Sequence, residues 1–223
     1  MLDLLEYLVF FIIGFIGIFY ILFYVFKREK AKVKLTSKLF VISILITIPT
    51  IFFEKIVLSY GRFPEMINYL YQAFVIGFIE EFIKRYILIS FTYKSHKQGR
   101  YLGLGYAIII ASGFATGENI CYFFGYRSYD LELLRVTLSS SGHLCFAIIL
   151  GILITIARHA RRGFTKQYYF VMSLVVPIIL HSIFDYIILL NIYRLLPVYL
   201  VFVVIIYLDF FKKYKLYITY LMI

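Results

Sequence analysis

Several residue types that report on a protein's environment are scarce in this chain of 223 residues. Tryptophan is absent, so an aromatic belt at a membrane interface would have to consist of tyrosine and phenylalanine. The two cysteines, Cys121 and Cys145, lie in apolar stretches and are too few for a disulfide framework or a cysteine-based zinc site. Charged residues make up 16% of the chain and hydrophobic residues 63%, whereas a soluble domain has about 25% charged residues. This composition excludes an ordinary soluble domain and indicates an integral membrane protein.

Acidic residues are scarcer than basic ones, with 12 Asp and Glu against 23 Lys and Arg and a formal net charge of +11. In a soluble protein this excess would suggest nucleic acid as a partner. In a membrane protein it more often marks the cytoplasmic loops. We therefore expect the lipid bilayer as a partner and no nucleic acid.

Apolar runs of roughly 20 residues are long enough to cross a bilayer, and the chain has seven of them. Sixteen Lys and Arg residues lie in the connecting segments on one side of the resulting topology, and four lie on the other. The positive-inside rule then places the N-terminus outside and the C-terminus in the cytoplasm. The sequence therefore predicts an all-α fold, a polytopic bundle of about seven transmembrane helices that forms a single integral-membrane domain. The predicted spans are approximately 5–26, 39–60, 67–91, 101–126, 137–157, 168–190 and 195–211.

Polar side chains inside these spans are the candidates for function, because a charge near the centre of a membrane helix costs about 2.5–3.5 kcal/mol on insertion scales. The candidates are Glu80, Glu81, Lys84 and Arg85 in the third span, Glu118 and Asn119 in the fourth, His143 in the fifth, and His181 and Asp185 in the sixth.

The charged residues of the third span have helical spacing. Glu80 with Lys84 and Glu81 with Arg85 are i, i+4 pairs in which the acid precedes the base, the more favourable order. Such pairing lowers the cost of insertion and keeps two adjacent carboxylates ionised.

His181 and Asp185 are also four residues apart, so the Asp185 carboxylate can accept a hydrogen bond from the imidazole and orient it toward a metal. A rise of about 1.5 Å per residue puts Glu118, His143 and His181 roughly 9 to 13 Å below the predicted outer ends of their helices. The two acids of the third span come out deeper, near 20 Å by the same count. We expect the polar residues to converge in the outer half of the membrane.

Two imidazoles and carboxylates at one depth match a zinc hydrolase site, in which about three protein ligands leave one position for water. The metal would let the bound water ionise near neutral pH, and a nearby glutamate would accept its proton. Gly113 and Gly117 form a Gly-x-x-x-Gly motif just before Glu118, which allows helix backbones to approach closely there.

Four ordered motifs resemble the PrsW-type intramembrane proteases, a family related to the CAAX prenyl proteases and to bacteriocin-processing or immunity proteins. The Phe-x-x-x-His motif of the CAAX branch is absent, because Ser139 stands in the place of the phenylalanine. The Gly-Glu-Asn segment is instead similar to the PrsW branch. The motifs are Glu80-Glu81-Phe-Ile-Lys84-Arg85, Gly113-Phe-Ala-Thr-Gly-Glu118-Asn119-Ile, His143 with Gly151 behind it, and His181-Ser-Ile-Phe-Asp185.

The resemblance covers about residues 67–190, which would be the catalytic core. It implies a multi-pass, metal-dependent protease of the bacterial cell membrane. It would make the first, extracytoplasmic-side cut in a membrane-anchored anti-sigma factor, a single-span protein, in a stress-response cascade. The essential acids would be Glu80 and Glu81, and Glu118, His143 and His181 would complete the site. Among these we predict His143, His181 and Glu118 as ligands of a zinc ion. Glu80 or Glu81 would be the general base, and the other would be structural or bind substrate, because the two lie about 100° apart on the helix. The predicted supporting residues are Lys84, Arg85, Asn119 and Asp185.

Other interpretations fit the same residues. The buried acids and histidines could form the relay of a proton or ion transporter, but such a relay would extend from face to face. A CAAX-protease-like or bacteriocin-immunity protein is a further alternative. Glu54 and Lys55, near the outer end of the second span, are interpreted as structural. The sequence does not fix the substrate, the metal or the oligomeric state.

Overall fold

The structure is a computed structural model that describes residues 33–93, 102–125, 129–160, 163–192 and 194–220. These residues form long α-helices and no strand, as the all-α prediction requires. The first predicted span, 5–26, lies outside the described residues. The helices are α2 (Val33–Leu58), α3 (Glu65–Leu88), α4 (Leu102–Gly125), α5 (Tyr129–His159), α6 (Phe164–Leu189) and α7 (Leu195–Tyr220), with a short π-helical segment, Ile89–Tyr93, after α3.

Three of the described helices are long and apolar enough to cross a membrane by length and composition. They comprise Lys34–Leu58 in α2, Ser139–His159 in α5 and Phe164–Leu189 in α6. The other predicted crossings, and the orientation of the termini, remain predictions. The outer faces of the helices carry large exposed apolar side chains, such as Phe52 and Phe74, which suit contact with lipid.

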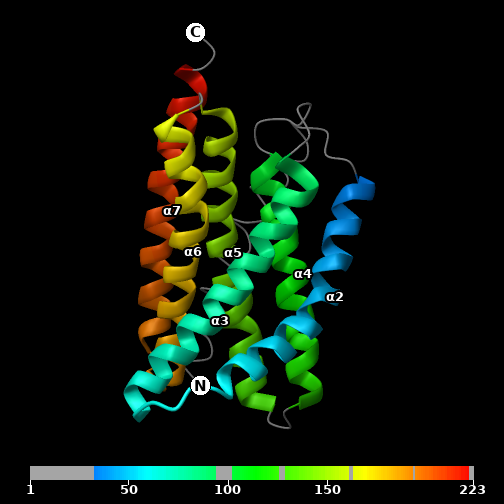
Figure 1. Cartoon of the computed structure of the whole chain (residues 1–223), viewed down its shortest axis with the longest axis vertical. Helices are drawn as coiled ribbons and strands as arrows, with labels where there is room; N and C mark the ends of the chain where they lie inside the picture. The colour runs from blue at the N-terminus through cyan, green and yellow to red at the C-terminus, as the bar shows by residue number, and fades with distance from the viewer. Residues whose placement is uncertain (1–32, 94–101, 126–128, 161–162, 193, 221–223) are drawn as a thin grey trace.

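Helix α5 is the central element of the bundle. Its residues 142–157 are buried, and it packs against α4, α6 and α7 (Figure 1). Helix α2 lies against α4 on one side of the bundle, and α6 and α7 lie together on the other side. Helix α3 crosses the bundle obliquely and packs mainly against α6, with further contacts to α2 and α4.

A close approach between α2 and α4 depends on two glycines. A Cβ atom at Gly113 would lie 2.5 Å from the carbonyl oxygen of Phe40, and one at Gly117 would lie 2.8 Å from that of Ile44. Neither position can therefore hold a side chain without separating the helices. This confirms the predicted role of the Gly-x-x-x-Gly motif, and Thr47 Oγ1 also lies 3.4 Å from the Phe114 carbonyl across the same contact.

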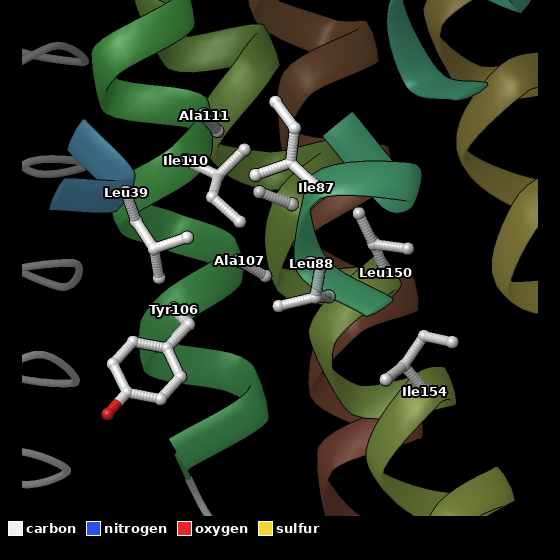
Figure 2. Packing of buried hydrophobic residues seen from close by; sticks show 10 residues of the cluster. Leu39, Ile87, Leu88, Tyr106, Ala107, Ile110, Ala111, Leu150 and Ile154 are labelled. Atoms are coloured by element: carbon white, nitrogen blue, oxygen red, sulfur yellow. The ribbon is translucent and has the colours of Figure 1, made fainter. Parts of the chain in front are cut away.

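A hydrophobic cluster joins four helices on one side of the polar residues (Figure 2). Leu88, one turn after Lys84 on α3, is fully buried in this cluster, so α3 changes from charged to apolar along one face. The cluster comprises Leu39 of α2, Ile87 and Leu88 of α3, Tyr106, Ala107, Ile110 and Ala111 of α4, and Ala147, Leu150 and Ile154 of α5.

Candidate metal centre and active site

The acids of α3 surround a single lysine in the protein interior. Lys84 Nζ donates hydrogen bonds to Glu81 Oε1 at 2.7 Å and to Glu80 Oε2 at 3.1 Å. All three side chains are at most 3% exposed. The ammonium also lies 4.7 Å from the centre of the Phe114 ring, a favourable cation–π position. One buried cation therefore compensates two adjacent carboxylates, as an ion pair needs in the absence of water.

Arg85 contacts two residues of helix α6. Its Nε donates to Ser173 Oγ at 3.0 Å and its Nη2 donates to the Phe170 carbonyl at 2.9 Å. Arg85 therefore joins α3 to α6, while Glu81 pairs with Lys84. Of the two predicted i, i+4 pairs, Glu80 with Lys84 is formed, and Lys84 also pairs with Glu81 at i, i+3.

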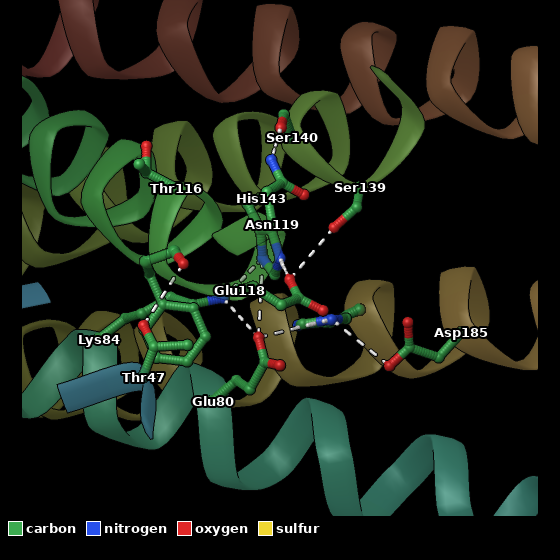
Figure 3. A network of polar contacts seen from close by, with 12 residues as sticks. Thr47, Glu80, Lys84, Thr116, Glu118, Asn119, Ser139, Ser140, His143 and Asp185 are labelled. Carbon is green, nitrogen blue, oxygen red and sulfur yellow. Dashed lines mark hydrogen bonds and ion pairs between the residues drawn. The ribbon is translucent and has the colours of Figure 1, made fainter. Parts of the chain in front are cut away.

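His143 extends from α5 between two acids and the lysine (Figure 3). Its Nδ1 lies 2.8 Å from Lys84 Nζ, and its Nε2 lies 2.7 Å from Glu118 Oε2. Because an ammonium can only donate, Nδ1 accepts and the Nε2–H group donates to Glu118. The same Glu118 oxygen accepts a hydrogen bond from Ser139 Oγ at 3.2 Å, so this carboxylate of α4 is bonded to two residues of α5.

His181 of α6 is oriented by Glu81. Its Nδ1 lies 2.9 Å from Glu81 Oε1, a carboxylate oxygen that can only accept. The predicted partner Asp185 lies on the other side of the ring, with Oδ2 3.4 Å from Nε2. A neutral His181 therefore carries its proton on Nδ1, and its unprotonated Nε2 lies 3.9 Å from Glu80 Oε2.

Glu80, His143 and His181 form a group that can hold a metal ion. Each offers one ligand atom, these atoms lie within 4.8 Å of one another, and all three side chains are buried. Two imidazoles and one carboxylate are a donor set of catalytic metal sites. The residues present therefore fit a divalent metal. Within the described residues, Glu118 is not in this group and lies on the opposite side of the His143 ring from Glu80.

Further contacts hold the side chains around this group in place. Asn119 Nδ2 donates to Ser140 Oγ at 3.1 Å and joins α4 to α5 beside Glu118. Phe146 stacks on His181 with ring centres 5.2 Å apart, and the two imidazoles meet edge to face at 5.1 Å. These ring contacts restrict the orientation of both imidazoles.

Counting residues from the helix ends gives the wrong relative depth for Glu80. It places this residue well below the histidines, whereas Glu80 Oε2 lies 3.7 Å from His143 Nδ1. Helix α3 runs obliquely across the bundle in Figure 1, so its rise per residue along the bundle axis is smaller than that of an upright helix. The tilt brings the third span's acids level with the other site residues.

Glu54 of α2 also lies close to these residues. The sequence interpretation gave it a purely structural role. It is 7% exposed, and its charge interacts with those of Glu118, Asp185 and Lys84. The neighbouring Lys55 is exposed. A signal was present in the sequence, because Ser43, Thr47, Thr50 and Glu54 recur at helical spacing and place polar groups on one face.

Together, the apolar spans and the buried group of histidines and carboxylates are features that a membrane-embedded, metal-dependent hydrolase would need. The model of the family described as "PrsW family intramembrane metalloprotease" matches residues 31–209. The chain belongs to this family and is a membrane protease. The match includes the predicted catalytic core and disfavours the transporter, CAAX-type and immunity alternatives.

Individual relatives agree with this assignment. The protein named "Protease PrsW" of Clostridioides difficile strain 630 is 32% identical over 187 residues, covering 79% of this chain and 78% of the relative. That of Halalkalibacterium halodurans is 32% identical and covers 68% of each chain. That of Bacillus subtilis strain 168 is 34% identical over 112 residues and covers 50% of each chain. No solved structure matches the chain.

Proposed function

We propose that this protease cuts a membrane-anchored anti-sigma factor, or a similar single-span regulatory protein, on the extracytoplasmic side of the bacterial cell membrane. The cut would be metal-dependent, with zinc as the metal. The whole chain would act as one multi-pass domain, with its catalytic core at about residues 67–190.

The convergence of Glu80, His143 and His181 from three helices is the observation that carries the proposal. Two histidines and a glutamate are the protein ligands of several zinc hydrolases. A metal held there would polarise the scissile carbonyl and make a bound water more acidic. This geometry favours Glu80 over the predicted Glu118 as the carboxylate ligand, because Glu80 Oε2 lies within 4 Å of a ring nitrogen of each histidine.

The remaining acids then take distinct roles. Glu81 is our candidate for the general base, since Oε1 is held by Lys84 and His181 while Oε2 is buried without a hydrogen-bond partner. Glu118 orients His143 through Nε2, as acceptors of a ligand histidine do. Lys84 holds Glu80, Glu81 and His143 Nδ1, and its contact with Glu81 would leave Glu80 and His143 available to a metal.

The proposed side of cleavage is supported by the positions of the site residues along their helices. Glu118 lies near the end of α4 at Gly125, and His181 lies in the last third of α6, which ends at Leu189. These are the ends that the distribution of basic loops predicts to face outside. A substrate would therefore be cut just below the outer surface.

Reconstitution in proteoliposomes tests the proposal. The substrate is a single-span anti-sigma factor, and mass spectrometry of the products maps the cut. We expect a cut on the extracytoplasmic side of the substrate's span, lost on chelation and restored by zinc. Glu80→Gln and His181→Ala should abolish it.

Glu65→Gln is the matched control, because Glu65 is an exposed acid at the start of α3. It should cleave as the wild type does. Full activity after chelation, or in Glu80→Gln, would contradict metal-dependent cleavage by this site. A cut on the cytoplasmic side would contradict the proposed orientation.

A further inference from the structure

Helix α2 presents a line of buried polar side chains toward the rest of the bundle. Three hydroxyl groups in this line bond the carbonyl four residues earlier in their own helix: Ser43 to Leu39 at 2.8 Å, Thr47 to Ser43 at 2.8 Å, and Thr50 to Ile46 at 2.7 Å. Each hydroxyl is therefore satisfied without help from another helix.

Glu54 ends this line and is the exception. It is 7% exposed, and its Oε1 is buried with no hydrogen-bond partner. This oxygen therefore lacks a hydrogen-bond partner among the described residues. An unsatisfied buried polar group of this kind is rare in native proteins and calls for a specific cause.

The surroundings of Glu54 are those of the metal centre. Its carboxylate lies close enough to those of Glu118, Asp185 and Glu80 for their charges to interact. Glu54 does not, however, belong to the three-residue group that can hold a metal. Pro49 lies inside α2 one turn before it, and in Figure 1 the helix turns toward α3 along its second half.

The charges of the buried groups do not balance. Glu54, Glu80, Glu81 and Glu118 are buried, and Lys84 is the single Lys or Arg among the described buried residues. A divalent metal and Lys84 together still leave one negative charge when these acids are ionised, before Asp185 is counted. A buried charge of this kind needs a partner.

We propose that Glu54 binds a positively charged side chain, Lys or Arg, of the substrate close to the scissile bond. This inference rests on the proposed function and identifies a specificity residue for it. Phe53 and Ile56, next to Glu54 on α2, are exposed, so the carboxylate lies within one turn of the surface from which a membrane-embedded substrate would approach. A charge-assisted hydrogen bond to the substrate would satisfy Oε1 and offset the excess charge.

A matched substrate series in proteoliposomes tests the inference. Single-span substrates carry Lys, Gln or Glu at each position near the mapped cleavage site, and kcat/KM is measured for the wild type, Glu54→Gln and the control Glu65→Gln. At one position the wild type should prefer Lys to Gln by about tenfold or more, as expected of a charged hydrogen bond. Glu54→Gln should reduce that preference to about twofold or less, while Glu65→Gln keeps it.

Two outcomes would overturn the inference without contradicting the proposed function. One is wild-type cleavage with no preference for Lys at any position, a result that does not depend on whether Glu54→Gln folds. The other is a Glu54→Gln enzyme that cleaves all substrates and keeps the wild-type preference. Failure of the wild type to cleave any substrate would instead contradict the proposed function itself.

Discussion

Lys84 holds the candidate site together at the scale of single residues. Its ammonium contacts Glu80, Glu81 and His143 within 3.1 Å and is 1% exposed. Two neighbouring carboxylates in an apolar interior repel each other and are poorly solvated, so a cation between them is needed to keep both ionised. Lys84 also shares Glu80 and His143 with the group that can hold a metal.

Replacing this lysine should destabilise the fold. Lys84→Met leaves two buried carboxylates without their cation, and breaking a buried ion pair from one side costs about 3–5 kcal/mol. We expect a loss of this size in the free energy of unfolding in detergent. Lys55→Met removes an exposed lysine from α2 and is the control, with an expected change below about 0.5 kcal/mol. Equal stability of the two variants would contradict a compensating role for Lys84.

The two adjacent acids of α3 should respond differently to the same substitution. Glu81→Gln removes the proposed general base, so kcat should fall by about 10²–10⁴-fold while bound metal is retained. Glu80→Gln removes a proposed ligand, so both metal and activity should be lost. Kinetics and metal analysis on the same preparations distinguish the two. Loss of metal from Glu81→Gln with retention in Glu80→Gln would reverse the assignment.

At the scale of helices, the contact between α2 and α4 positions Glu54 relative to Glu118. Gly113 and Gly117 remove side chains at the two closest points, and Thr47 lies against the same surface. Any widening of this contact displaces Glu54 and Glu118 relative to each other.

A larger residue at Gly117 should therefore loosen the bundle. The Cβ atom added in Gly117→Ala would lie 2.8 Å from a backbone carbonyl oxygen, which cannot move without shifting α2. We expect a cost of about 1–3 kcal/mol in thermal or denaturant unfolding, typical of overpacking. Gly142→Ala is the control, because the nearest neighbours of its Cβ would be the Phe184 and Phe146 rings, at 3.4 and 3.5 Å, and no backbone atom is among them. A Gly117→Ala variant as stable as Gly142→Ala would contradict the close contact.

The all-α fold, and the convergence of Glu80, His143 and His181, could be predicted from the sequence, but not how the polar residues pair. Apolar length and the Gly-x-x-x-Gly spacing follow from rules local to one segment. The pairing of Glu81 with His181, and of Lys84 with His143, depends on how helices distant in sequence cross. Residue counting assumes upright helices, which is why it misjudged the depth of Glu80 on the oblique α3. Glu54 was assigned to structure because no motif surrounds it.

At the scale of the whole molecule, the described helix ends nearest the basic segments lie together. The start of α2, the ends of α5 and α7 and the starts of α4 and α6 share one end of the bundle in Figure 1. This arrangement agrees with the predicted alternation of basic and less basic loops, which places one end of the bundle in the cytoplasm.

Terminal tags test the predicted topology. With seven crossings, an N-terminal tag should be accessible to protease on intact bacterial cells without an outer membrane, or on spheroplasts. A C-terminal tag should become accessible only after permeabilisation. A tagged cytoplasmic protein in the same cells is the control that shows whether the membrane is intact. Accessibility of both tags, or of neither, before permeabilisation would contradict an odd number of crossings.

The central claim is that Glu80, His143 and His181 hold one metal ion inside the membrane. Metal content of the purified protein, measured by mass spectrometry of the elements, tests it most directly. The wild type should contain about one zinc per chain, and His143→Ala, His181→Ala and Glu80→Gln should each lose most of it, while Glu65→Gln keeps it. Substitutions that leave the metal content unchanged, or a folded and proteolytically active wild type without metal, would contradict the account.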